Sequence, residues 1–210
     1  MPAKGAVRAH RTFTETARRE QIVRAAVSTL AELGYADTSL GKIAKTAGLS
    51  SVGMISYYFA GKAELMGEVV TTVLAAAEEA VAPRVAAGTS AVDRFRTYVE
   101  ASLEYVAAHR AEAVALIEIT VGTRDPVRGG DVDAGVLEIL ADLVTRAQAE
   151  RAAGPDTPVD PIDPHLMAVA VRGAINNAVG HSLRRRPGPG ADPELAAEGA
   201  RIAELFARAL

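Results

Sequence analysis

Apolar side chains recur every three to four residues along most of this chain, and polar residues fill the positions between them. The first clear stripe lies within residues 22–33 and predicts an amphipathic helix that begins near residue 14 or 16. Gly34 follows at the position where glycine ends many helices. Alanine dominates the composition, and the β-branched residues form no alternating runs, so the pattern predicts an all-α fold.

The same spacing predicts later helices over residues 62–81, 91–108, 111–122, 132–152, 164–183 and 193–210. Ser90 is placed to cap one of them, and Asp163-Pro164 and Asp192-Pro193 each set a capping carboxylate before a proline at the first helical position. Residues 125–133 and 154–164 are predicted loops. The segment 111–122 is apolar on nearly every side, which predicts a buried helix.

Residues 38–59 predict two short helices joined by a tight turn. Thr38 or Ser39 can cap the first helix, and Ser50 or Ser51 the second, because a hydroxyl oxygen can accept from a free N–H group. Gly48 ends the first helix, since glycine adopts a positive φ without steric cost. This arrangement is typical of a helix-turn-helix, whose second helix enters the DNA major groove, although plain helical hairpins share the pattern.

The flanking segments 18–35 and 60–65 extend the motif, and together residues 16–66 resemble the N-terminal domain of the tetracycline-repressor (TetR) family of bacterial transcription regulators. The residues that carry this resemblance are Ile22, Ala25, Ala26, Leu33, Gly34, Tyr35, Ile43, Ala44, Gly48, Tyr57, Phe59, Lys62 and Leu65. There are two departures from the usual pattern. Six residues separate Gly48 from Ile55 where five are usual, and Ser56 stands where a tyrosine is usual.

The helical pattern along the chain predicts about nine helices and no strand. The resemblance implies an N-terminal three-helix DNA-binding domain over residues 16–61 and a C-terminal helical bundle over residues 62–210. It implies a homodimer that binds a double-stranded DNA operator, with the last two helices of each chain forming a four-helix interface. Tyr57 and Lys62 match family positions that touch DNA. The candidate DNA-binding residues are Ser39, Lys42, Ser50, Ser51, Val52, Ser56, Tyr57 and Lys62.

The charge distribution agrees with this division. The net charge is −3, but residues 1–62 hold nine Lys and Arg against four Asp and Glu, and residues 63–210 hold 14 against 22. A basic N-terminal part suits contact with phosphates, and the acidic remainder is repelled by them. Residues 1–15 are predicted to be a flexible basic arm.

Several classes of function are disfavoured by what the sequence lacks. No cysteine is present, the four histidines are scattered, and no phosphate-binding or nucleophile motif occurs, so we expect no cofactor, no metal and no enzyme activity. The N-terminus has no apolar leader region, and no apolar run is long enough to span a membrane, so we expect a cytoplasmic protein with no membrane partner.

A few polar residues stand within otherwise apolar helices of the C-terminal part. A small-molecule site is typically an apolar cavity with a few polar groups, and the candidate effector-binding residues are Tyr98, Tyr105, Glu118, Arg172 and Asn176. Packing or exposure explains the two tyrosines equally well. For Glu118 the alternative is an ion pair with Arg96 or Arg172, or a position on an exposed edge.

These observations favour a ligand-responsive transcription regulator, a repressor released from a palindromic operator by an unknown small-molecule effector. One alternative is a helix-turn-helix regulator controlled by a protein partner without a small ligand. Another is an all-α enzyme that merely carries a helical hairpin.

Overall fold

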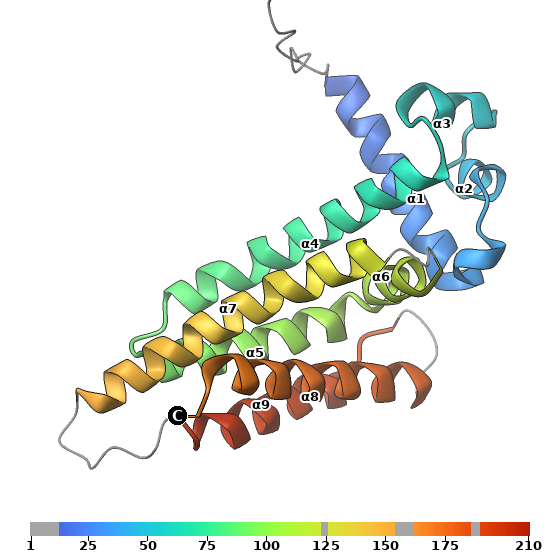
Figure 1. Cartoon of the computed structure of the whole chain (residues 1–210). Helices are drawn as coiled ribbons and strands as arrows, with labels where there is room; N and C mark the ends of the chain where they lie inside the picture. The colour runs from blue at the N-terminus through green and yellow to red at the C-terminus, as the bar shows by residue number, and fades with distance from the viewer. Residues whose placement is uncertain (1–12, 123–125, 154–161, 186–189) are drawn as a thin grey trace, which may run out of the picture.

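The computed structural model describes residues 13–122, 126–153, 162–185 and 190–210, and within these ranges it contains nine α-helices and no strand. The helices are α1 (Phe13–Asp37), α2 (Leu40–Thr46), α3 (Val52–Tyr58), α4 (Lys62–Ala86), α5 (Ala91–Ala108), α6 (Arg110–Gly122), α7 (Pro126–Ala152), α8 (Pro164–Arg185) and α9 (Pro193–Ala207). The predicted all-α class is confirmed for this part of the chain. As Figure 1 shows, α1, α2 and α3 gather at one end of the long helix α4, and α5 packs along α4 while α8 and α9 lie farther from it.

One core holds the N-terminal helices together. Its largest fully buried side chains include Ile22 from α1, Ile43 from α2, Ile55 from α3 and Leu65 from α4, each with no exposed surface. Each such side chain contributes about 1.5–3 kcal/mol on burial. Helix α6 adds Ile119, so this core includes part of a helix from the C-terminal part of the sequence. The domain boundary predicted between residues 61 and 62 stays a prediction.

A second core lies between α5, α7, α8 and α9, where Phe95, Leu140, Val171 and Leu195 are fully buried. Helix α5 is its centre, in contact with α4, α7 and α9. Gly199 lets α5 and α9 approach closely, because a Cβ atom there would lie 3.0 Å from the Cβ of Leu103.

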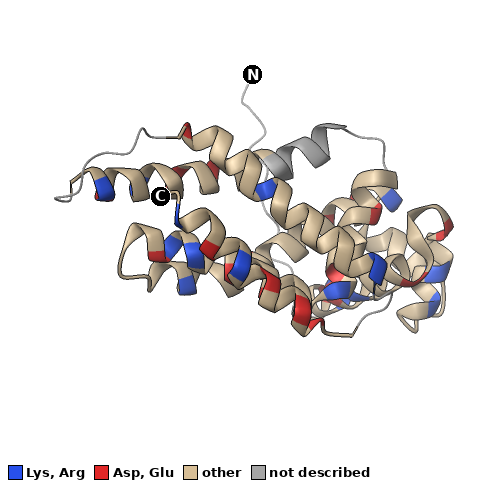
Figure 2. Cartoon of the chain, turned by 90° about the horizontal axis from the view of Figure 1, so that it is seen from below, with Lys and Arg blue, Asp and Glu red and all other residues tan. Residues whose placement is uncertain are grey.

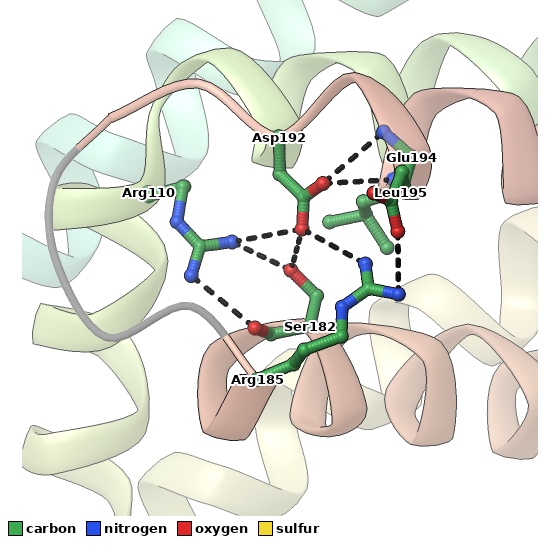
Figure 3. Close-up of polar contacts among 6 residues, drawn as sticks. All are labelled: Arg110, Ser182, Arg185, Asp192, Glu194 and Leu195. Carbon is green, nitrogen blue, oxygen red and sulfur yellow. Dashed lines mark hydrogen bonds and ion pairs between the residues drawn. The ribbon is translucent and has the colours of Figure 1, made fainter.

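A buried polar cluster ties the start of α6 to the end of α8 and the start of α9 (Figure 3). Arg110 donates to the Oγ of Ser182 over 2.5 Å, and its guanidinium lies 3.5 Å from the Asp192 carboxylate. Ser182 in turn donates to Asp192 over 2.5 Å, and Arg185 approaches the same carboxylate at 3.7 Å. Arg110, Ser182 and Asp192 have at most 1% of their surface exposed, so each buried charge has a partner of opposite sign.

Three helix starts predicted from capping signals in the C-terminal part of the chain are confirmed. Ser90 accepts from the Asp93 N–H, Asp163 accepts from the Leu166 N–H, and Asp192 caps α9. Each cap satisfies a backbone N–H that has no partner within its own helix.

Four expectations about helix extent and burial were wrong. Helix α1 already begins at Phe13, so residues 13–15 belong to it, whereas the rest of the predicted arm lies outside the described residues. Helix α7 begins at Pro126 rather than near residue 132, because proline suits the first helical turn and the glycines that follow only weaken a helix. Helix α4 continues through Pro83, which is exposed, so the carbonyl group that loses its partner can bind water. Helix α6 is buried on one side only, and Val121 is 73% exposed.

The predicted loop 154–164 lies largely outside the described residues. Among the residues that the structure describes, no helix is long and apolar enough to cross a membrane.

Candidate nucleic-acid interface

Helices α2 and α3 are joined by the turn 47–51, as the pattern of residues 38–59 predicts. Ser39 caps α2 by accepting from the Lys42 N–H, and Gly48 has a φ of 66°. The Leu49 N–H then bonds the Ala44 carbonyl over 2.9 Å, which closes the turn. Ser51 occupies the cap position of α3 but makes no side-chain bond there, so its hydroxyl is not committed to the helix end.

Seven of the eight candidate DNA-binding residues lie on the exposed surface of this motif. They are Ser39, Lys42, Ser50, Ser51, Val52, Ser56 and Tyr57. The Tyr57 side chain is 75% exposed, and the hydroxyl of Ser56 bonds only within its own helix, to the Val52 carbonyl at 3.4 Å. Groups that bond locally at a helix surface can be offered to a partner at small cost.

This surface carries no negative side chain. From Thr38 to Ala63 the sequence contains three lysines and neither Asp nor Glu. Lys42 and Lys45 are exposed on α2. Sequence reasoning did not include Lys45 among the DNA-binding candidates, although a basic residue in the last turn of α2 favours phosphate contact in the same way. The charged positions of the described chain can be followed in Figure 2.

Arg19 of α1 holds the far end of α3 in place. Its guanidinium donates to the Tyr58 carbonyl over 2.6 Å, pairs with Glu68 at 3.1 Å and lies 4.2 Å from the centre of the Phe59 ring. The residue is buried. It therefore serves as a brace for the second helix of the motif, which fixes the direction in which α3 projects.

Lys62, the eighth candidate, is engaged within the chain. Its ammonium donates to the carbonyls of Tyr35 and Thr38, both over 2.7 Å, and lies 3.9 Å from the centre of the Tyr35 ring. Burial lowers the pKa of the Lys62 ammonium. Lys62 thus ties the start of α4 to the end of α1, a role that its match to a DNA-touching family position does not indicate.

Glu118 joins the same corner from the opposite side. Its carboxylate accepts from the Tyr35 N–H over 2.7 Å, beside Gly34, whose φ of 75° breaks α1. A Cβ atom at Gly34 would lie 3.1 Å from a Glu118 oxygen. The expected alternative partner Arg96 instead pairs with Glu204 at 2.9 Å. Helix α6 therefore contacts the end of α1 directly through this carboxylate.

The five predicted effector-binding residues divide among different surroundings. Tyr98 and Arg172 interact across α5 and α8, where burial raises the pKa of the Tyr98 hydroxyl and the Arg172 charge partly opposes that rise. Tyr105 donates to Glu112 over 2.6 Å, and burial together with this bond raises its pKa. Asn176 is exposed on α8, and Glu118 lies at the corner beside Tyr35. The grouping of all five in one site stays a prediction.

Comparison with known proteins agrees with the geometry of the motif. Residues 22–69 match the family described as bacterial regulatory proteins, tetR family. The chain is 38% identical over 105 residues to the HTH-type transcriptional regulator BetI of Stenotrophomonas maltophilia (strain R551-3), which covers 50% of this chain and 49% of that protein. It is 37% identical over 87 residues to BetI 1 of Chromohalobacter salexigens, which covers 41% of each. The N-terminal segment of the chain therefore matches the TetR family. The alignments span about half the length of these curated relatives or less.

Solved structures share the fold over nearly the whole chain. The fatty acid degradation regulator FadR from Bacillus halodurans matches with a TM-score of 0.75 and 20% identity over 92% of this chain and 96% of that one. FadR from Bacillus subtilis in complex with stearoyl-CoA matches with a TM-score of 0.71 and 20% identity over 91% of this chain and 98% of that one. At this identity the likeness concerns the fold alone.

Sequence reasoning missed two features of this chain that arise from long-range contacts. Arg19 braces α3 from 39 residues away, and Glu118 bonds Tyr35 from 83 residues away. The only local signal was a carboxylate in an apolar helix, which indicates a buried partner without naming it.

Proposed function

We propose that this chain is a dimeric, DNA-binding transcription regulator whose affinity for its operator is changed by a small molecule. The observation that carries the proposal is the surface of α2 and α3, which is exposed, polar and free of acidic side chains between Thr38 and Ala63. Below it, Ile43 and Ile55 are fully buried, so both helices are fixed to the body of the protein. A rigid helix with exposed small side chains suits the major groove.

The test begins with selection of bound fragments from genomic DNA, followed by fluorescence anisotropy with the selected sequence. Ser56→Glu places a negative charge on the exposed face of α3 and should abolish binding, because that face meets phosphates and base edges. Thr145→Glu is the matched control, since Thr145 is also exposed and also bonds only the carbonyl four residues before it, on α7. Equal affinity of Ser56→Glu and the wild type would exclude α3 as the recognition helix.

The dimer proposal rests on an exposed apolar face of α8 and α9. Leu166 is 62% exposed and Val169 46% on α8, and Leu205 is 66% exposed on α9. Two copies of such a face bury each other across a two-fold axis. The small residue Ala178 also lies on α8, but it is only 4% exposed within one chain. Arginine at Ala178 should therefore disrupt folding, and it is a poor test of the dimer.

A sharper test uses the double variant Leu166→Arg with Val169→Arg in sedimentation experiments. It should remain folded and become monomeric, and its operator affinity should fall because one half-site binds weakly alone. Val121→Arg on α6 is the control, because Val121 is equally apolar and 73% exposed but lies on another helix. A dimeric double variant would exclude this face as the interface.

The effector proposal draws support from the B. subtilis FadR structure, which contains stearoyl-CoA. In the proposed mechanism the effector binds one of two dimer conformations better, and DNA binds the other, so the effector releases the operator as it would from a repressor. An effector with equal affinity for both conformations would shift nothing. Addition of candidate compounds to the anisotropy assay tests this, and a regulator controlled by a protein partner would respond to none of them.

A further inference from the structure

A groove of about 350 Å³ lies where the DNA-binding helices meet the rest of the protein. Helix α1 lines it with Val23 and Val27, α4 with Val73 and Ala76, and the junction of α5 and α6 with residues 108–112. None of the five predicted effector-binding residues lines this groove. Its volume is within the range of small-molecule sites, so it is large enough for a ligand of a few carbon atoms.

The wall formed by α5 and α6 is held rigidly. Arg110 begins α6, and its guanidinium is fixed by Ser182 and Asp192 in the buried polar cluster (Figure 3). Next to it, the Glu112 carboxylate accepts from Tyr105 over 2.6 Å, and the His109 ring stacks on Tyr105 with 4.1 Å between ring centres. Because these side chains are fixed before any ligand arrives, the groove costs little free energy to organise.

The lining of the groove selects a particular chemistry. Its apolar residues are all aliphatic, which suits an alkyl chain, and its polar groups include the hydroxyls of Ser28 and Thr72. Arg24 adds a guanidinium whose ion pair with Glu20 is long, at 3.9 Å, and exposed on both sides. Such a pair is worth little, so Arg24 can turn to a ligand at small cost. Glu112 also lines the groove, and its negative charge disfavours a ligand with two negative charges.

We propose that the groove between α1, α4 and the α5–α6 junction binds a small aliphatic monocarboxylate. The carboxylate pairs with Arg24 and accepts from the hydroxyls, and the alkyl chain lies on Val27, Val73 and Ala76. A quaternary ammonium ion is disfavoured, because Arg24 repels it and the groove is lined by no Phe, Tyr or Trp side chain.

Binding of the carboxylate in this groove would be linked to DNA binding, and this link rests on the proposed function. Helix α1 belongs to the DNA-binding unit, whereas the α5–α6 junction is tied to α8 and α9 through Arg110. A ligand that contacts both α1 and the α5–α6 junction favours one position of α1 relative to that junction. If α1 takes a different position when the protein binds DNA, the ligand changes operator affinity.

The first experiment measures binding to the full chain without DNA, by isothermal titration calorimetry and saturation-transfer NMR. The probes are hexanoate, 1-hexanol and hexyltrimethylammonium, which share an alkyl chain and differ in charge. Hexanoate should bind with a Kd of about 1 mM, and the other two at least about tenfold more weakly. Equal binding of all three probes, or no binding of hexanoate, overturns the proposal.

Two pairs of variants locate the site. Arg24→Gln should weaken hexanoate binding about five- to tenfold, whereas Arg146→Gln, which loses a comparable exposed pair with Asp142 on α7, should not change it. Thr72→Phe fills the groove from an exposed position and should abolish binding, whereas Thr71→Phe, next to it and outside the lining, should not. If either pair shows no difference, hexanoate binds elsewhere.

The two proposals fail separately. Hexanoate binding with no selected DNA sequence would leave the groove proposal standing and overturn the proposed function. Operator binding by a chain that does not bind hexanoate would support the proposed function and overturn the groove proposal. A folded state of each variant is checked by its thermal unfolding curve.

Discussion

The helix-turn-helix surface and the buried polar cluster use the same kinds of side chain in opposite ways. On α2 and α3 the polar groups are exposed, and they bond locally, as Ser56 does to the Val52 carbonyl of its own helix. In the cluster, Arg110 and Asp192 bond across three helices and have at most 1% of their surface exposed. Polar groups of the first kind are available to a partner, and those of the second kind stabilise the chain that contains them.

Lys62 lies between these two classes. It is half-buried, and its ammonium already donates to two carbonyls, so at most part of its hydrogen-bonding capacity remains for DNA. We therefore expect that loss of a buried cluster residue mainly lowers stability, and that loss of an exposed residue of α2 or α3 mainly lowers DNA affinity.

The largest effect is expected in the buried cluster. Asp192→Ala should lower the free energy of unfolding by about 3–5 kcal/mol, because it leaves the Arg110 charge buried without its carboxylate partner. The measurement is equilibrium unfolding in urea. Asp142→Ala on α7 is the control, since its ion pair with Arg146 is exposed and should cost about 0.5 kcal/mol or less. A comparable loss in both variants would contradict the distinction between the two classes.

The stability of the protein in acid should also depend on the Asp192 carboxylate. Burial alone would raise the pKa of Asp192, but bonds from Ser182, from the N–H groups of Leu195 and Glu194, and the Arg185 charge hold the pKa below its ordinary value of 3.8. The unfolded chain therefore binds the proton more readily, so this stabilisation is complete above pH 3.8 and is lost as the pH falls through the lowered pKa.

Unfolding curves of the wild type and of Asp192→Asn between about pH 6 and pH 2 check this expectation. The asparagine variant should lack that part of the acid-induced loss, because residue 192 no longer titrates. Parallel loss of stability in both proteins would assign the acid response to other carboxylates.

An intermediate effect is expected at Lys62. Lys62→Ala should lower the free energy of unfolding by about 1–3 kcal/mol, because the carbonyls of Tyr35 and Thr38 lose a charged donor. Operator binding should weaken for all sequences, since the variant disturbs the corner between α1 and α4. The slope of log affinity against log salt should stay unchanged. A smaller slope with unchanged stability would instead assign Lys62 to a phosphate contact.

The smallest effect on stability is expected at Lys42. This exposed lysine donates only to the nearby Asp37 carbonyl, so Lys42→Ala should change the free energy of unfolding by less than about 0.5 kcal/mol. Operator affinity should fall about equally for all sequences, and the salt slope should decrease by about 1, as one phosphate contact is lost. An unchanged slope would place Lys42 outside the DNA interface.

The sequence alone determined those parts of this protein that depend on near neighbours. Caps such as Ser90 and Asp192 act within three residues, and Gly48 needs only its own φ, so the starts of α5 and α9 and the turn of the motif were predicted correctly. The starts of α1 and α7 were not. The family resemblance rested on the same local segment, residues 16–66, and the match to residues 22–69 agrees with it.

Only the tertiary structure decided which polar groups are free. Glu118 and Lys62 both bond Tyr35 at the end of α1, and their predicted contacts with an effector and with DNA stay predictions. Tyr35 lies 83 residues from Glu118 and 27 residues from Lys62. The bonded groups are its backbone N–H and carbonyl, which every residue except proline has, so the residue type does not reveal them. Helical periodicity fixes the face on which a side chain lies, but the fold alone brings a distant backbone group within reach of it.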